Sequence, residues 1–209
     1  STFLLENPKF PYEGNEKRAK KPSEYRIYSP QPEFKLDLSL LFHNAHLITS
    51  DLNRDGADDI VFIQQGRDYA PFENKSNYIL MSSGKIYKLQ KLPGKKSPYH
   101  GGTTGDIDND GDVDLLMAAD FETSQVFVNN GDGTFTKVTD RNVIVDQSGM
   151  GAAVGDYDND GDMDWFVTSI LQKPELFGNR LYRNMGSAVF EDATEEAGVA
   201  DGGWGWGAC

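Results

Sequence analysis

The chain has 209 residues, of which 38% are hydrophobic and 11% aromatic, a composition typical of a globular protein and not of a disordered chain. Its formal net charge of −13 argues against a nucleic-acid partner, because binding nucleic acid requires a basic surface. No stretch approaches the roughly 20 apolar residues of a membrane span, so we expect none. The single cysteine, Cys209, excludes a disulfide bond within the chain.

Residues 1–33 are predicted to form an extended N-terminal arm. They contain several prolines and the basic cluster Lys17–Lys21, and such a segment usually lies over a surface or serves as a linker. Because runs of like charge mostly face solvent, we favour a solvated arm over a specific docking site.

A repeat begins where the arm ends. Apolar and polar residues alternate from Phe34 to Leu40, which predicts a half-buried strand. Short alternating segments of the same kind surround Tyr87, Phe135 and Phe190. We therefore divide the chain into the arm and a repetitive domain over residues 34–209.

Three acidic loops of one pattern, D-x-[DN]-x-D-G-x-x-D, occupy residues 51–59, 106–114 and 156–164. Positions 1, 3, 5 and 9 carry side-chain oxygens, position 7 can offer its backbone carbonyl, and glycine at position 6 lets the backbone turn sharply. A hard cation such as Ca²⁺ takes about 6 to 8 oxygen ligands from a flexible shell. The predicted calcium ligands are Asp51, Asn53, Asp55, Ala57 and Asp59; Asp106, Asp108, Asp110, Asp112 and Asp114; and Asp156, Asp158, Asp160, Asp162 and Asp164.

Other interpretations of these loops are less favourable. An EF-hand would place a glutamate at position 12, but that position holds Phe62, Met117 and Val167. Acidic turns without a metal would bring like charges together, which raises their pKa values and is costly. A catalytic carboxylate pair, as in glycoside hydrolysis, would be expected once and not in every repeat.

The segments after the loops predict an all-β fold. Each loop runs directly into a short apolar stretch, which indicates a buried strand with the ninth aspartate at its start, and then into a hairpin with its own turn. A period of about 50 residues thus contains about four strands, the arrangement of a blade in a β-propeller of four-stranded antiparallel sheets. The only helix expected is one turn at residues 194–198, with Thr194 as its cap and Gly198 as its stop.

The last residues resemble the beginning of another repeat. Gly203–Cys209 aligns with Gly149–Ala153, the segment that leads into the third loop. We therefore expect an incomplete ring of about three blades plus part of a fourth, because a closed ring uses roughly 4 to 8. Further blades would come from the rest of a longer chain or from another chain.

The remaining motifs favour structural roles. His43 and His46 form an H-x-x-H pattern, but no further zinc ligand of the right type is evident nearby. The sequence His100–Gly102 resembles an oxyanion loop, yet no G-x-S-x-G motif accompanies it. Asn74 begins a glycosylation sequon, which matters only in a secreted protein. Core or inter-blade packing is favoured over sugar stacking for the tryptophans Trp165, Trp204 and Trp206.

The loop together with its following strand resembles the FG-GAP (VCBS-type) repeat, the blade unit of integrin α-subunit heads and of many secreted propellers. The segments 151–164, 179–184 and 190–199 are especially similar to the branch of that family that includes cartilage acidic protein. The resemblance covers about residues 34–209 and implies a propeller with Ca²⁺ bound at positions 1, 3, 5, 7 and 9 of each loop.

The first loop departs from the family pattern. Asn53 replaces the acid at position 3, so this loop has fewer ligand carboxylates than the other two. Arg54 also places a cation in the loop. Since the number of charged ligands tunes calcium affinity, we predict that the first loop binds most weakly.

These features predict a non-enzymatic, secreted or cell-surface propeller used for adhesion or recognition, with calcium in a structural role. Its expected partner is a protein or a glycan, together with the further blades. The alternative is an accessory or catalytic propeller domain of a secreted carbohydrate-active enzyme. That alternative requires a single cluster of acidic and aromatic residues in a cleft, and the sequence supplies none outside the loops.

Overall fold

The computed structural model describes residues 4–6, 26–28, 44–64, 77–83, 86–94, 99–120, 124–146, 148–170, 178–203 and 205–208. The chain divides into two compact units, Ser1–His43 and Asn44–Cys209. In the first unit, β1 (Leu4–Glu6) pairs antiparallel with β2 (Arg26–Tyr28). The rest of the predicted arm and the strand predicted at residues 34–40 lie outside the described residues.

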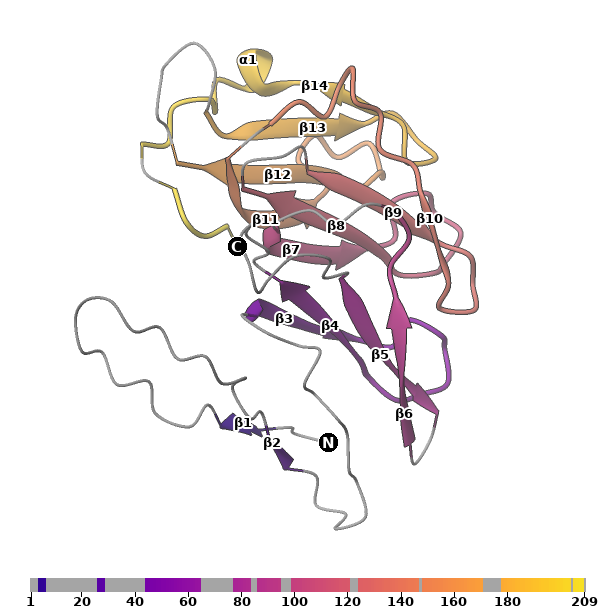
Figure 1. Cartoon of the computed structure of the whole chain (residues 1–209). Helices are drawn as coiled ribbons and strands as arrows, with labels where there is room; N and C mark the ends of the chain where they lie inside the picture. The colour runs from indigo at the N-terminus through magenta and orange to yellow at the C-terminus, as the bar shows by residue number, and fades with distance from the viewer. Residues whose placement is uncertain are drawn as a thin grey trace, which may run out of the picture. The chain divides into compact units, whose positions relative to one another are not determined.

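The second unit consists of three four-stranded antiparallel sheets, which we call blades 1, 2 and 3 (Figure 1). Blade 1 contains β3 (Asn44–Ser50), β4 (Asp59–Gln64), β5 (Tyr78–Ser83) and β6 (Ile86–Lys91). Blade 2 contains β7 (Tyr99–Gly105), β8 (Asp114–Ala119), β9 (Gln125–Asn129) and β10 (Phe135–Lys137). Blade 3 contains β11 (Gly149–Gly155), β12 (Asp164–Ser169), β13 (Arg180–Asn184) and β14 (Phe190–Asp192). The all-β prediction of propeller-like blades is confirmed.

Within each blade the strands pair in chain order, and the acidic loop joins the first strand to the second. The last residue of the first strand pairs with the ninth aspartate of the loop, as in Ser50 opposite Asp59. The segments around Tyr87, Phe135 and Phe190 form the fourth strands, so they close the blades rather than open them. Each of the three blades therefore has the predicted number of strands, and the predicted start of the repetitive domain at residue 34 lies outside the described residues.

Among the described residues, the only helix is α1 (Thr194–Ala197). Gly198 ends it with a φ of 67°, as predicted. The predicted cap was wrong, because Ala193 occupies that position and Thr194 lies inside the helix. The buried Thr194 hydroxyl instead accepts a hydrogen bond from the Leu181 N–H, which ties the helix to β13. No helix in the described part of the chain is long and apolar enough to cross a membrane.

The blades pack face to face through apolar side chains. β7 lies beside both β3 and β11, so the first strands of the three blades are neighbours. Successive side chains of a strand point to opposite faces, and β8 is buried on both. Leu115 and Met117 join the cluster shared with blade 1, whereas Leu116 and Ala118 join the cluster shared with blade 3. Blade 2 is therefore sandwiched between its neighbours.

Glycines permit the first strands to approach closely. A Cβ atom on Gly101 of β7 would lie 2.3 Å from the Met150 carbonyl oxygen, so only glycine fits at this contact. Gly151 holds the same register position in β11 and lies against the backbone of Gly207 and Ala208. Residues 205–208 therefore pack on β11 much as β11 packs on β7, at the place where the tail alignment put a further blade. That further blade itself stays a prediction.

The close approach of β7 and β11 predicts that Gly101→Ala destabilises the protein. The added methyl group would force the two backbones apart, and overpacking of this kind costs about 1–3 kcal/mol in the free energy of unfolding. Urea unfolding measures the loss. Gly155→Ala is the matched control, since a Cβ atom there meets nothing within 4 Å. Equal stability of the two variants would rule out this role for Gly101.

Candidate metal centre

The ninth aspartate is the fixed point of every loop. Asp59, Asp114 and Asp164 begin the second strands of their blades and are fully or almost fully buried. In each case one carboxylate oxygen accepts the backbone N–H of loop position 2, and the other accepts a backbone N–H from the third strand. The position 2 donors are Leu52 at 2.8 Å, Ile107 at 2.8 Å and Tyr157 at 2.9 Å, and the third-strand donors are Ser82, Asn129 and Asn184.

The turn itself is closed by the first aspartate. The N–H of the glycine at position 6 donates to that carboxylate, over 2.9 Å from Gly111 to Asp106. The glycines at position 6 have positive φ values of 85°, 88° and 95°, and so do the residues at position 4, Arg54, Asn109 and Asn159. Such a tight left-handed turn curls the carboxylates of positions 1, 3 and 5 toward the ninth aspartate.

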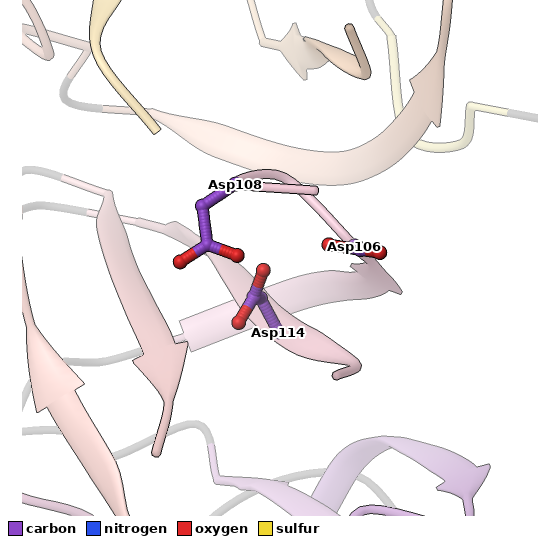
Figure 2. A group of neighbouring side chains, drawn as sticks. All are labelled: Asp106, Asp108 and Asp114. Atoms are coloured by element: carbon purple, nitrogen blue, oxygen red, sulfur yellow. The ribbon is translucent and has the colours of Figure 1, made fainter. Parts of the chain in front are cut away.

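The second and third loops bring three carboxylates together. Oxygens of Asp106, Asp108 and Asp114 lie within 4.8 Å of one another, and the same holds for the group Asp156, Asp158 and Asp160. Figure 2 shows the Asp108 carboxylate reaching down from the loop toward Asp114, with Asp106 on the far side of the turn. Both groups can hold a metal ion.

The donor set fits a hard cation. Asp106 Oδ1 is buried and has no hydrogen-bond partner, although a buried carboxylate oxygen without a partner is costly. Oxygens of this kind suit a hard cation such as Ca²⁺. The close carboxylates are those of positions 1, 3 and 9 in the second loop and those of positions 1, 3 and 5 in the third. A bound cation would neutralise the clustered charge and satisfy this oxygen.

Burial and mutual repulsion raise the pKa values of the clustered carboxyls. Burial raises the pKa of Asp114 to about 6; the nearby carboxylates of Asp108 and Asp110 add to the rise, and the N–H groups of Asn129 and Ile107 oppose it. Burial also raises the pKa values of Asp59, Asp108 and Asp164. The hydrogen bonds within the protein therefore do not fully offset the cost of burying these negative charges close together.

The first loop is arranged differently, as its sequence predicted. Among the described residues it forms no group of three close acids. The Asn53 side chain donates 3.1 Å to the Ser82 carbonyl, and the Ser82 hydroxyl donates 3.0 Å to the Asp55 carboxylate. The expected position of Arg54 needs correction: its guanidinium does not lie over loop 1 but contacts Asp112 of loop 2, with Nε 2.7 Å from Oδ1.

Positions 5 and 7 are joined within each loop. The N–H of position 7 donates to the carboxylate of position 5, over 3.0 Å from Ala57 to Asp55, 2.8 Å from Asp112 to Asp110 and 2.9 Å from Asp162 to Asp160. The carboxylates at position 5 thus support the turn, and Asp160 also belongs to a three-acid group whereas Asp55 and Asp110 do not.

Sequence reasoning missed two residues of the site, Asn129 and Asn184. Both lie at the start of the hairpin turns, are buried and donate their backbone N–H to the ninth aspartate. The available signal was an asparagine two residues before a glycine in both hairpins, Gly131 and Gly186. The first repeat has Ser82 at the same place, which obscured the pattern.

Of the described histidines and tryptophans, Trp165 directly follows the third loop, and His46, His100 and Trp206 lie outside the loops, with Trp206 56% exposed. His100 pairs with Asp120 across 3.5 Å and meets the Trp206 ring edge-on, and with His46 it lines a cavity of about 400 Å³. These residues form no metal-binding group among those the structure describes. Trp165 is fully buried in the core, as predicted. Outside the described residues lie His43, Asn74, Trp204 and Cys209.

The raised pKa of Asp114 predicts how the stability of metal-free protein depends on pH. Between 3.8 and about 6 the folded state binds more protons than the unfolded state, so the free energy of unfolding should fall as pH rises through this window. Urea unfolding of chelator-treated protein over this range measures the slope. Asp114→Asn removes the titrating group and should remove this component; an identical pH profile in the variant would contradict the assignment.

Comparison with known proteins agrees with this geometry. The family model of the FG-GAP-like repeat matches residues 51–117 and again residues 106–167, which together cover more than half of the chain. Each match begins at the first aspartate of a loop and ends within the second strand of the following blade. A comparison with curated proteins finds no significant match. The chain belongs to the family of FG-GAP-like repeat proteins.

Proposed function

We propose that the chain is a calcium-binding propeller module that serves adhesion or recognition outside the cell, with Ca²⁺ in a structural role and without catalysis. The observation that carries the proposal is the recurrence of one acidic corner in three successive blades, each built around a buried ninth aspartate. An active site is normally made once, whereas a structural brace is needed in every repeat.

Calcium suits the corner better than other cations do. The donors are carboxylates, one amide and backbone carbonyls, all hard oxygen ligands, and no cysteine or histidine lies in the loops. Several ligands are carried on a flexible turn, which favours Ca²⁺ over the smaller and more rigidly coordinated Mg²⁺. When bound, the ion neutralises the clustered charge and adds bonds between the turn and the ninth aspartate.

The structural role follows from what that aspartate already joins. Asp114 lies at the start of β8 and accepts N–H groups from its own loop and from β9. A cation held on Asp106, Asp108 and Asp114 would therefore fix the first three strands of blade 2 relative to one another. In blade 3 the close group is Asp156, Asp158 and Asp160, and Asp164 joins that loop to β13 through the N–H groups of Tyr157 and Asn184.

The location and the partner are inferred from the family and the metal. FG-GAP repeats are typical of extracellular proteins, and free calcium outside cells is sufficient for sites with dissociation constants of about 10⁻⁴ to 10⁻³ M. The branch that includes cartilage acidic protein remains the part of the family we favour. A protein or a glycan is the proposed ligand, bound by surfaces other than the buried corners.

Removal of calcium should lower the melting temperature. At about 1 mM calcium and a dissociation constant near 10⁻⁴ M, each site adds about 1.4 kcal/mol to the free energy of unfolding. Three sites would then raise the melting temperature by on the order of 10 °C. Thermal scans with calcium and with EGTA measure the difference.

Single-site variants test whether the effect arises in these loops. Asp108→Asn and Asp158→Asn should each remove about a third of the calcium-dependent rise in melting temperature. Asp140→Asn, on an exposed turn outside the loops, should leave that rise unchanged. If EGTA left the melting temperature of the unmodified protein unchanged, the calcium proposal would be refuted.

The three sites should differ in affinity. Loop 1 has Asn53 in place of an acid, so calorimetric titration should resolve one site weaker than the other two. Asn53→Asp restores the missing carboxylate and should tighten that site. If Asp55→Asn instead removes the tightest site, the predicted order of affinities is wrong.

A further inference from the structure

Asn129 and Asn184 occupy equivalent positions at the ends of β9 and β13, and both side chains are buried. Each uses its side chain within its own blade in two ways. The amide nitrogen donates to the carbonyl of loop position 8, Val113 or Met163, and the amide oxygen accepts the N–H of the hairpin glycine, Gly131 or Gly186.

A further bond of each asparagine crosses to the preceding blade. Asn129 Nδ2 donates 2.7 Å to the carbonyl of Leu52 in loop 1, and Asn184 Nδ2 donates 2.7 Å to the carbonyl of Ile107 in loop 2. Leu52 and Ile107 are the position 2 residues whose own N–H groups donate to the ninth aspartates of their loops.

These bonds form one continuous path through the three loops. It runs from Asp59 through Leu52 and Asn129 to Asp114, and then through Ile107 and Asn184 to Asp164. Every aspartate on the path is a proposed calcium ligand. The path therefore links each metal site to the next by short hydrogen bonds between buried groups.

We propose that Asn129 and Asn184 are positioning residues that couple the calcium sites of neighbouring blades; this proposal rests on the proposed function. A cation on Asp59 holds the backbone of Leu52 in place through its N–H, and the carbonyl of Leu52 accepts the hydrogen bond from Asn129. Asn129 in turn holds one oxygen of Asp114. The second loop is then already ordered and loses less conformational entropy when it binds calcium, so its calcium affinity rises.

Blade 1 shows what a blade without this residue looks like. Ser82 holds the same position and also donates its N–H to the ninth aspartate, but its hydroxyl turns to Asp55 within its own loop. Serine has no amide group, and its side chain is too short to reach another blade. Ser82 therefore supplies a substitution that the fold already tolerates at this position.

A second repeated contact follows the same direction. Position 4 of one loop reaches position 7 of the next: Arg54 contacts Asp112, and Asn109 Nδ2 donates 2.6 Å to Asp162. Blade 1 has Ala57 at position 7 and so lacks the acceptor as well as the asparagine. Blades 2 and 3 are thus equipped to hold a preceding loop, and blade 1 is not.

The burial of position 2 reflects these contacts. Leu52 and Ile107 are 1% and 0% exposed, whereas Tyr157, at the same position in loop 3, is 42% exposed. The two residues that a following asparagine contacts are thus enclosed at the junction between blades. The carbonyl that accepts the hydrogen bond from each asparagine lies inside that junction and is shielded from competing water.

A double-mutant experiment on the full chain tests the coupling. Asp55→Asn disables loop 1, and calorimetric calcium titration then reports the affinity of the remaining two sites. This variant should weaken those sites by about 2-fold or more, which is less than the full coupling because loop 1, the weakest site, is only partly occupied while they fill. In the Asn129→Ser background, the same Asp55→Asn change should alter their affinity by less than about 2-fold.

Asn130→Ser is the matched control. Asn130 lies beside Asn129 in the same hairpin but is exposed and bonds only within the hairpin, to Thr134 and Thr136. The effect of Asp55→Asn should be the same in this background as in the unmodified protein. Thermal unfolding in EGTA checks that Asn129→Ser still folds, as Ser82 in blade 1 indicates it should.

The outcomes separate the two proposals. Calcium binding with an equal effect of Asp55→Asn in all three backgrounds, or with no effect in any, would overturn the coupling and leave the proposed function standing. The absence of any calcium binding to the unmodified chain would overturn both. Loss of the effect in Asn129→Ser alone would establish the coupling.

Discussion

The structure depends on one buried carboxylate per blade, the ninth aspartate of the acidic loop. Its two oxygens accept N–H groups from the turn and from the third strand, while its backbone begins the second strand. Three segments of each blade therefore meet at one charged group. Because burial disfavours that charge, as the raised pKa of Asp114 shows, the corner is stable only with strong compensation. The divalent cation that we propose would supply this compensation and would explain why acidic residues concentrate in these loops.

The local structure of the blades could be predicted from the sequence. Loop turns, the strands that follow them and the hairpins depend on neighbouring residues, such as glycine at positive φ in Gly111 and Gly131, and these were predictable. Contacts between blades were not. The guanidinium of Arg54 was placed beside its own loop, because sequence distance gives no indication that Asp112 is nearer. The contact of Asn129 could not be predicted either, because its acceptor, Leu52, lies in another repeat.

The repeats are similar in backbone and unequal in chemistry. Blade 2 is buried on both faces; its Asn129 contacts loop 1, and its own loop is contacted by Asn184 of blade 3. Blade 1 lacks the asparagine and the acid that would hold a preceding loop, and its loop has the fewest ligand carboxylates. These differences give the array a direction.

The central claim is that divalent ions occupy the acidic corners and brace them. Crystals grown in millimolar calcium, or soaked with a lanthanide, allow anomalous scattering to locate heavy ions directly. One peak should lie inside each loop, surrounded by the side-chain oxygens of positions 1, 3, 5 and 9 and the carbonyl of position 7. Loops that hold only water under these conditions, with their carboxylates unchanged, would contradict it.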